Sequence, residues 1–167
     1  MSRAFVKDDN EALPSEELPE RPVNSEPNYI TPAGLAKLRR KVEKLHDEHV
    51  RLKGAQEDFD RPRLAQVERD LRYYQARLES AILVDVSKQP RDEVHFGASV
   101  KTEDEGGAVH SIAIVGEDET DAAHGRVSWQ SPLAKALMGA KVGDTVTWNR
   151  PAGSTTLNVL EIHYPRT

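Results

Sequence analysis

Two stretches decide the fold, residues 35–52 (LAKLRRKVEKLHDEHVRL) and residues 64–82 (LAQVERDLRYYQARLESAI). In each, apolar or neutral residues recur at alternating steps of 3 and 4: Leu35, Leu38, Val42, Leu45, His49 and Leu52, then Leu64, Val67, Leu71, Tyr74, Leu78 and Ala81. This spacing keeps one narrow stripe on a helix and is typical of a coiled-coil seam. Because a connector of about eight residues cannot reach the far end of a helix, we expect an antiparallel hairpin, called the finger below.

Local signals predict where the two helices begin and end. Thr31 can cap the first helix and Pro32 suits its first position. Gly54 tolerates a left-handed helix end, and Asp60 with Pro62 repeats the start signal for a second helix that we expect to reach about Leu83. The tip of the finger then carries three carboxylates, on Glu57, Asp58 and Asp60.

After Asp85 the pattern changes to short β-rich runs separated by glycine and proline turns. Strands are expected at 94–101, 108–115, 126–129, 145–148 and 155–164. Between the third and fourth, a serine cap, a proline at the first position and a closing glycine predict one short helix from Ser131 to Gly139. The fold class is therefore α+β: an N-terminal antiparallel coiled-coil hairpin followed by a β-sheet domain with one short helix.

Composition divides the chain into three segments: an acidic tail at 1–28, expected to be disordered, the finger at 29–85, and the sheet domain at 86–167. The tail either only solubilises the protein or covers part of its own or a partner's surface. A net charge of −5 argues against a wholesale electrostatic grip on nucleic acid. No cysteine and no long apolar run occur, so we expect a soluble cytoplasmic protein without a membrane segment.

Seven short motifs in order resemble the Gre family of bacterial transcription elongation factors (GreA/GreB), across roughly residues 29–164. They are Thr31-Pro32-Ala33-Gly34 with Lys37-Leu38, Ala81-Ile82-Leu83-Val84-Asp85, Phe96-Gly97-Ala98-Ser99-Val100, Ile114-Val115-Gly116-Glu117-Asp118-Glu119, Ser131-Pro132-Leu133-Ala134-Lys135-Ala136-Leu137, Lys141-Val142-Gly143-Asp144 and Pro151-Ala152-Gly153. The resemblance implies an FKBP-like C-terminal domain that docks on RNA polymerase near its secondary channel, and a finger that enters the channel.

The resemblance also implies an accessory factor rather than an enzyme, which meets nucleic acid only through the polymerase complex. We expect it to be a monomer without a tightly bound cofactor. The residues that match the family's docking region best are Ser131, Pro132, Leu133 and Lys135. Basic residues on the finger's flanks are either solvated or lie along a negatively charged channel.

The tip departs from the family pattern. Family members hold a second Mg²⁺ at the polymerase active site with tip carboxylates, a role open here to Glu57, Asp58 and Asp60. The usual Gly-Asp and Glu-Asn-Ala elements are absent, and the finger is shorter by roughly one heptad per helix, about 10 Å of reach. Three functions stay open: stimulation of transcript cleavage, occlusion of the channel without cleavage, or regulation of nucleoside diphosphate kinase, as proposed for the related short-hairpin protein Rnk.

Overall fold

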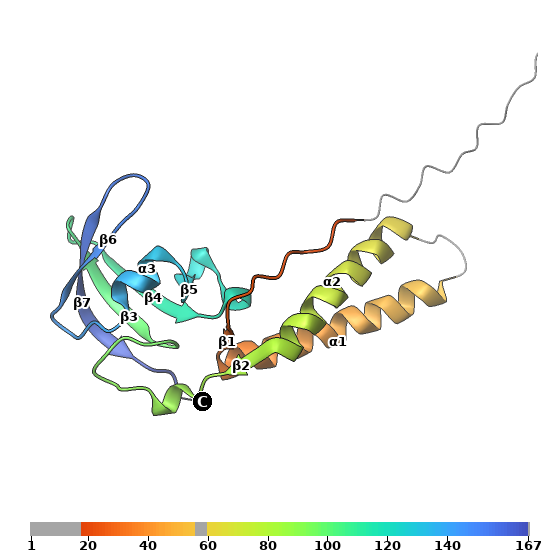
Figure 1. Cartoon of the computed structure of the whole chain (residues 1–167), viewed down its shortest axis with the longest axis horizontal. Coiled ribbons are helices and arrows are strands. Elements are labelled where there is room, and N and C mark those ends of the chain that lie inside the picture. Colours follow the sequence, from red (N-terminus) through yellow and green to blue (C-terminus); the bar gives the residue numbers. More distant parts are fainter. Residues whose placement is uncertain (1–17, 56–59, 167) are drawn as a thin grey trace, which may run out of the picture.

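The structure, a computed structural model, describes residues 18–55 and 60–166. A helical hairpin projects from one end of a curled sheet domain, which gives the molecule an elongated shape (Figure 1). This arrangement confirms the predicted α+β fold. No helix within the described ranges is long and apolar enough to cross a membrane.

The hairpin consists of α1 (Pro32–Gly54) and α2 (Arg61–Ser80). The predicted caps are confirmed: Thr31 Oγ1 accepts from Gly34 N–H at 3.0 Å, and Asp60 Oδ1 accepts from Arg63 N–H at 2.9 Å. The predicted left-handed end is wrong, because Gly54 is the last helical residue and Ala55 follows in an extended conformation.

The seam of the hairpin lies where the 3 and 4 spacing predicted it. Leu45, Val67 and Leu71 are buried together, and further residues of the stripe pack against them: Val42, Leu52 and Tyr74. His49 is half-buried at the seam, with its Nε2 3.1 Å from Glu68 Oε1 across the hairpin.

A small parallel strand pair closes the base of the finger. α2 ends at Ser80, so the prediction that it reaches Leu83 is wrong; the next three residues form β2 (Ala81–Leu83). β2 pairs with β1 (Asn28–Ile30), in register Asn28 with Ala81 and Ile30 with Leu83. The chain therefore enters and leaves the finger at the same place.

The domain is built on a five-stranded sheet of order β5-β4-β3-β7-β6. Its strands are β3 (Ser99–Asp104), β4 (Val109–Val115), β5 (Arg126–Ser128), β6 (Thr145–Trp148) and β7 (Thr155–His163). The β4–β5 pairing is parallel and the other pairings are antiparallel. Short helices lie outside it: η1 (Val86–Lys88), η2 (Glu117–Glu119), η3 (Ala122–His124) and α3 (Pro132–Leu137).

The first strand of the domain begins later than the sequence predicts. The predicted strand at 94–101 begins too early. In the structure, Val94 N–H bonds to the carbonyl of Ala140 and Gly97 has a φ of 88°. That left-handed conformation turns the chain and suits glycine, so β3 begins at Ser99.

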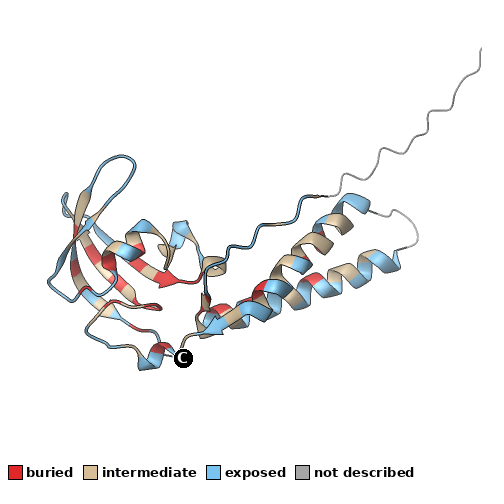
Figure 2. Ribbon diagram, viewed as in Figure 1, coloured by how far each residue is buried: buried red, intermediate tan, exposed pale blue. Residues whose placement is uncertain are grey.

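The main core lies between the sheet and α3, and Figure 2 shows buried residues concentrated on the strands. It contains Val86, Val94, Ala98, Val100, Ile112, Ile114, Ala134, Leu137, Ala140, Val159 and Tyr164. Trp129 and Leu133 pack against it from partly exposed positions. This core holds the start of α3 beside the open face of the sheet.

Candidate functional site

A buried ion pair joins the finger to the sheet domain. Arg77 on α2 is only 2% exposed, and its Nε–H donates to Asp118 Oδ2 on η2 at 2.6 Å. The same guanidinium donates to Asn28 Oδ1 at 2.6 Å and to Glu117 Oε2 at 3.3 Å. A buried charge is tolerated only when it is paired and hydrogen-bonded, so these contacts tie α2, β1 and η2 into one joint.

Tyr73 adds a second contact to Asp118. Its hydroxyl donates to Asp118 Oδ1 at 2.7 Å. Burial, and then the neighbouring Asp118 carboxylate, raise the pKa of Tyr73 well above its usual range. The phenol is therefore a stable donor at neutral pH, and both oxygens of Asp118 are engaged by α2.

Glu119 fastens the start of α1 to the domain. Its carboxylate accepts from Thr31 N–H at 3.1 Å, from Gly116 N–H at 2.9 Å and from the Thr31 hydroxyl. A Cβ at Gly34 would lie 2.1 Å from Glu119 Cδ, so a side chain there would push this carboxylate away from Thr31. Both helices of the finger are thus anchored on the short segment 117–119.

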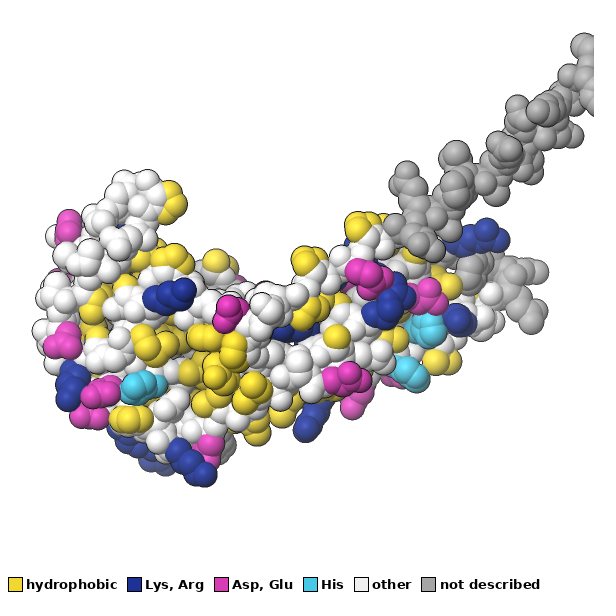
Figure 3. Space-filling model, in the orientation of Figure 1, with side chains coloured by type: hydrophobic (Ala, Val, Ile, Leu, Met, Phe, Trp, Pro, Cys, Tyr) yellow, Lys and Arg dark blue, Asp and Glu magenta, His cyan; other side chains and the backbone are white. Residues whose placement is uncertain are grey.

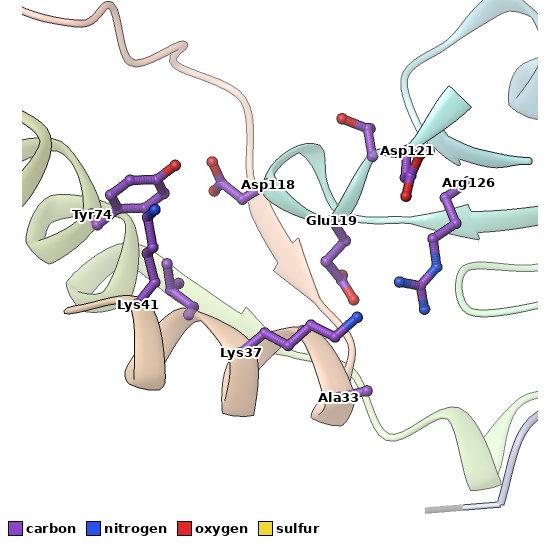
Figure 4. Close-up of a pocket in the computed structure, with 11 residues that line it drawn as sticks. Ala33, Lys37, Lys41, Tyr74, Asp118, Glu119, Asp121 and Arg126 are labelled. Carbon is purple, nitrogen blue, oxygen red and sulfur yellow. The ribbon is translucent and has the colours of Figure 1, made fainter. Parts of the chain in front are cut away.

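A polar hollow of about 320 Å³ opens beside this joint (Figure 4). The side chains of Lys37 and Arg126 extend into it from α1 and β5, next to Glu119 and Asp121. The acids are engaged, since Asp121 Oδ2 lies 2.6 Å from His124 Nδ1, which lowers the pKa of that carboxyl. Within the described ranges, no group of three or more His, Asp or Glu is placed to hold a metal ion.

A second and larger hollow, of about 1200 Å³, lies over the sheet. Three of the four predicted docking residues, Ser131, Pro132 and Leu133, line it, together with Val127, Trp148 and Leu157. Figure 3 shows a group of hydrophobic side chains on the sheet domain, and charged side chains on both the sheet domain and the finger. An exposed apolar hollow of this kind is a candidate surface for a protein partner.

The short helix α3 presents these residues as its sequence suggests. Ser131 Oγ accepts from Ala134 N–H at 3.2 Å, and Pro132 is exposed at the first helical position. Leu137 is 0% exposed and belongs to the core between α3 and the sheet. Leu133 is half-buried, and Lys135 is exposed but does not line the hollow.

The structure places one of the three tip acids. Asp60 is exposed and caps α2, so its carboxylate already has a structural partner in Arg63 N–H. Glu57 and Asp58 lie outside the described residues. The sequence patterns do not predict the joint around Arg77. The acidic run 117–119 could have indicated it, and this run is part of the motif 114–119 that resembles the Gre family.

Comparison with known proteins agrees with this architecture. Residues 89–164 match the family model described as transcription elongation factor GreA/GreB, C-terminal. The chain is similar to the transcription elongation factor GreB of Neisseria meningitidis serogroup B, with 34% identity over 153 residues that cover 82% of this chain and 94% of the relative. It is also similar to GreB of Xanthomonas axonopodis pv. citri, with 33% identity over 86% of this chain and 95% of the relative.

A solved GreA/GreB factor from Nitrosomonas europaea matches over 81% of this chain and 98% of its own, at 22% identity and a TM-score of 0.41. The sequence relatives reach both parts of the molecule, since they align over more than four fifths of the chain. The chain belongs to the GreA/GreB family of transcription elongation factors.

Proposed function

We propose that this factor docks on bacterial RNA polymerase through the hollow at Ser131, Pro132 and Leu133, and inserts the finger into the secondary channel. Family membership implies the polymerase as partner and an accessory rather than an enzymatic role. The observation that carries the proposal is the buried joint at Arg77, because a finger can be aimed from a distant dock only if its base is rigid. The protein would act as a monomer in the cytoplasm.

Transcript cleavage is the first candidate for what the inserted finger does. The two relatives compared above are named GreB, and factors of this family stimulate the polymerase's own cleavage of backtracked transcripts. In that mechanism Glu57, Asp58 or Asp60 would share a Mg²⁺ with the polymerase, since carboxylate oxygens are suitable ligands for this ion. The cation would activate water and neutralise developing charge, and the polymerase would supply its other ligands.

Channel occlusion without cleavage is the second candidate, and it rests on the expectation that the finger is shorter than in other family members. α1 and α2 contain 23 and 20 residues. At 1.5 Å per residue these helices are about 35 and 30 Å long, and a short finger at the same dock would block the channel without reaching the active site. A Rnk-like role in regulating nucleoside diphosphate kinase has no supporting feature among the described residues.

Binding and cleavage assays separate these functions. Purified protein should associate with bacterial core polymerase in a pull-down, and failure to associate would remove the proposal. Cleavage of the transcript in backtracked complexes above a no-factor control would support the first candidate. Binding with cleavage at background, together with inhibition of a longer factor's cleavage, would support occlusion. Co-purification with a kinase and not with polymerase would favour the Rnk-like role.

A further inference from the structure

Residues 18–27 form a segment, here called the strap, that runs along α2 before the chain enters β1 (Figure 1). Glu20 is paired with Arg72, whose Nη2–H donates to Glu20 Oε1 at 2.6 Å and whose Nε lies 3.1 and 3.2 Å from the two carboxylate oxygens. This contact lowers the pKa of Glu20. The pair joins residues 52 apart in sequence, so it fixes where the strap lies.

The next residue of the strap packs on an aromatic surface. The guanidinium of Arg21 lies 3.9 Å from the ring centre of Tyr73 and 4.9 Å from that of Tyr74. The two rings are edge-to-face, with centroids 5.0 Å apart. Arg21 Nη1 also lies 3.3 Å from Asp70 Oδ1. Arginine over an aromatic face with a carboxylate beside it is a recognition contact that depends on shape as well as charge.

The far end of the strap reaches the sheet domain. Asn24 Nδ2–H donates to Glu117 Oε2 at 2.7 Å, the oxygen that also accepts from Arg77. The strap therefore crosses the joint between the finger and the domain. It covers one face of α2, here called the α2 face, made by Asp70, Arg72, Tyr73 and Tyr74.

Charge complementarity explains why this segment occupies this face. Glu20 of the strap pairs with Arg72 and Arg21 pairs with Asp70, so both charged contacts of the strap with the α2 face join opposite charges. The helix as a whole carries an excess of basic residues, with Arg61, Arg63, Arg69, Arg72 and Arg77 against Glu68, Asp70 and Glu79. The carboxylate of Glu20 thus takes the position that a carboxylate of another protein would take on Arg72.

We propose that the strap is an intramolecular occupant of the α2 face, and that it must leave α2 before this face can contact an acidic surface of RNA polymerase during insertion of the finger. The inference rests on the proposed function, because it concerns access to the same finger. The strap is displaceable, since its ion pairs lie at the surface, where such pairs are weak and are screened by salt. Its tether keeps its local concentration high, so it closes again when the partner leaves.

Closure of the strap is measurable without polymerase. The chain has no cysteine, so spin labels on Pro22→Cys and Gln75→Cys report the distance from the strap to α2 without competing thiols. At about 50 mM salt we expect one narrow distribution of short distances between the two labels. This distribution should broaden near 0.5 M salt, because the Debye length falls from roughly 14 Å to 4 Å. Glu20→Ala with Arg21→Ala should broaden it at low salt. Glu26→Ala is the control for the loss of one strap carboxylate, because Glu26 is exposed and its side chain makes no described contact.

The polymerase arm uses a variant that lacks residues 1–24 and retains Asn28. It should bind core polymerase about threefold more tightly than the full chain at low salt, and the difference should vanish near 0.5 M salt.

A broad distribution of label-to-label distances that Glu20→Ala with Arg21→Ala leaves unchanged would overturn the claim that the strap lies on α2. If the strap lies on α2 but the full chain and the shortened chain bind core polymerase with equal affinity, the strap does not control access to the α2 face. Tighter binding of an RNA oligomer by the shortened chain, with polymerase affinity unchanged, would overturn the assignment to a protein surface. Absence of polymerase binding by both chains would refute the proposed function, and with it the role in access, whatever the distance shows.

Discussion

Arg77 Nε lies 2.6 Å from Asp118 Oδ2, although α2 and η2 are 41 residues apart at this point. Both side chains are withdrawn from water, at 2% and 10% exposure, whereas Glu117 in the same cluster is 43% exposed. Removing one partner of a buried pair leaves the other charge without compensation, which costs far more than losing a surface pair. Arg77 is therefore the buried charged anchor of α2, beside the contacts of Tyr73 with Asp118 and of Thr31 with Glu119.

Replacement of Arg77 should destabilise the protein far more than replacement of an exposed arginine of the finger. Arg77→Ala leaves Asp118 with Tyr73 as its remaining donor, so we expect a loss of about 3 kcal/mol in the free energy of unfolding. Urea denaturation followed by circular dichroism measures it. Arg39→Ala is the matched control on an exposed position and should change stability by about 0.5 kcal/mol or less. Equal losses in the two variants would contradict a special role for the joint.

The raised pKa of Tyr73 predicts how the free energy of unfolding changes at alkaline pH. Burial and Asp118 raise its pKa above the ordinary value of 10.0 in the folded state. Its contribution is therefore fully present below about pH 10 and is lost as pH rises from there through the folded-state pKa, because only the unfolded chain releases the proton. Urea unfolding at pH 8 and pH 11 should show a steeper decline for the wild type than for Tyr73→Phe.

The same substitution has a cost at neutral pH. Tyr73→Phe removes a hydrogen bond to a charged acceptor, so we expect a loss of about 1.5–3 kcal/mol at pH 7. The pKa of Tyr164 is also raised by burial, but this residue is present in both proteins and does not affect the comparison. Parallel pH profiles for the two proteins would show that Tyr73 ionises freely in the folded state.

The finger could be predicted because its determinants are local. A helix repeats every 3.6 residues, so the stripe that includes Leu45 and Leu71 predicts the seam from spacing alone. The caps at Thr31 and Asp60 depend on amides three residues away, and they too were predicted correctly. The same holds for α3, where Ser131 and Pro132 mark the start.

What the sequence could not give depends on distant partners. Ala81 continues the helical pattern of α2, and it becomes part of β2 only because β1 lies beside it. Arg77 precedes the seam residue Leu78 and resembles the other arginines on the finger's flanks; its burial depends on Asp118 and on Asn28 at β1. The larger hollow could be predicted in part, since α3 was recognised but the wall at Trp148 was not.

Replacement of the tip acids is expected to reduce stimulated transcript cleavage without weakening binding to the polymerase. If Glu57, Asp58 or Asp60 holds the shared Mg²⁺, replacement of all three should abolish stimulated cleavage in backtracked complexes and leave polymerase affinity unchanged. Asp60 also caps α2, and an alanine there costs about 1 kcal/mol. The variant should therefore be Glu57→Ala with Asp58→Ala and Asp60→Ser, because serine keeps the cap and removes the carboxylate.

Two controls complete the tip experiment. Asp60→Ser alone tests the contribution of this single carboxylate with the cap intact. Gln66→Ala changes an exposed residue of α2 that is six residues beyond Asp60, and it should leave cleavage unchanged. Equal cleavage by the wild type and the triple variant, both above a no-factor control, would exclude a metal-binding role for these acids.

Leu133 is expected to contribute a large share of the free energy of binding to core polymerase. A few residues with apolar centres usually carry most of the energy of an interface, and Leu133 is a half-buried leucine at the edge of the larger hollow. We expect Leu133→Asp to weaken binding to core polymerase at least tenfold, about 1.4 kcal/mol. Titration of labelled protein with polymerase measures the affinity. Removal of residues 1–24 should change it by only about threefold.

Leu133 also packs against the core, so its replacement needs a test of folding and a companion on the surface. Circular dichroism and the midpoint of urea unfolding show whether the Leu133→Asp domain stays folded. Pro132→Asp alters an exposed residue of the same rim with no buried packing to lose, and it should weaken binding in the same direction. Met138→Asp is the matched control, because Met138 is a 37% exposed apolar residue just beyond α3 that does not line the hollow. Unchanged affinity in folded Leu133→Asp and Pro132→Asp proteins would place the dock elsewhere on the domain.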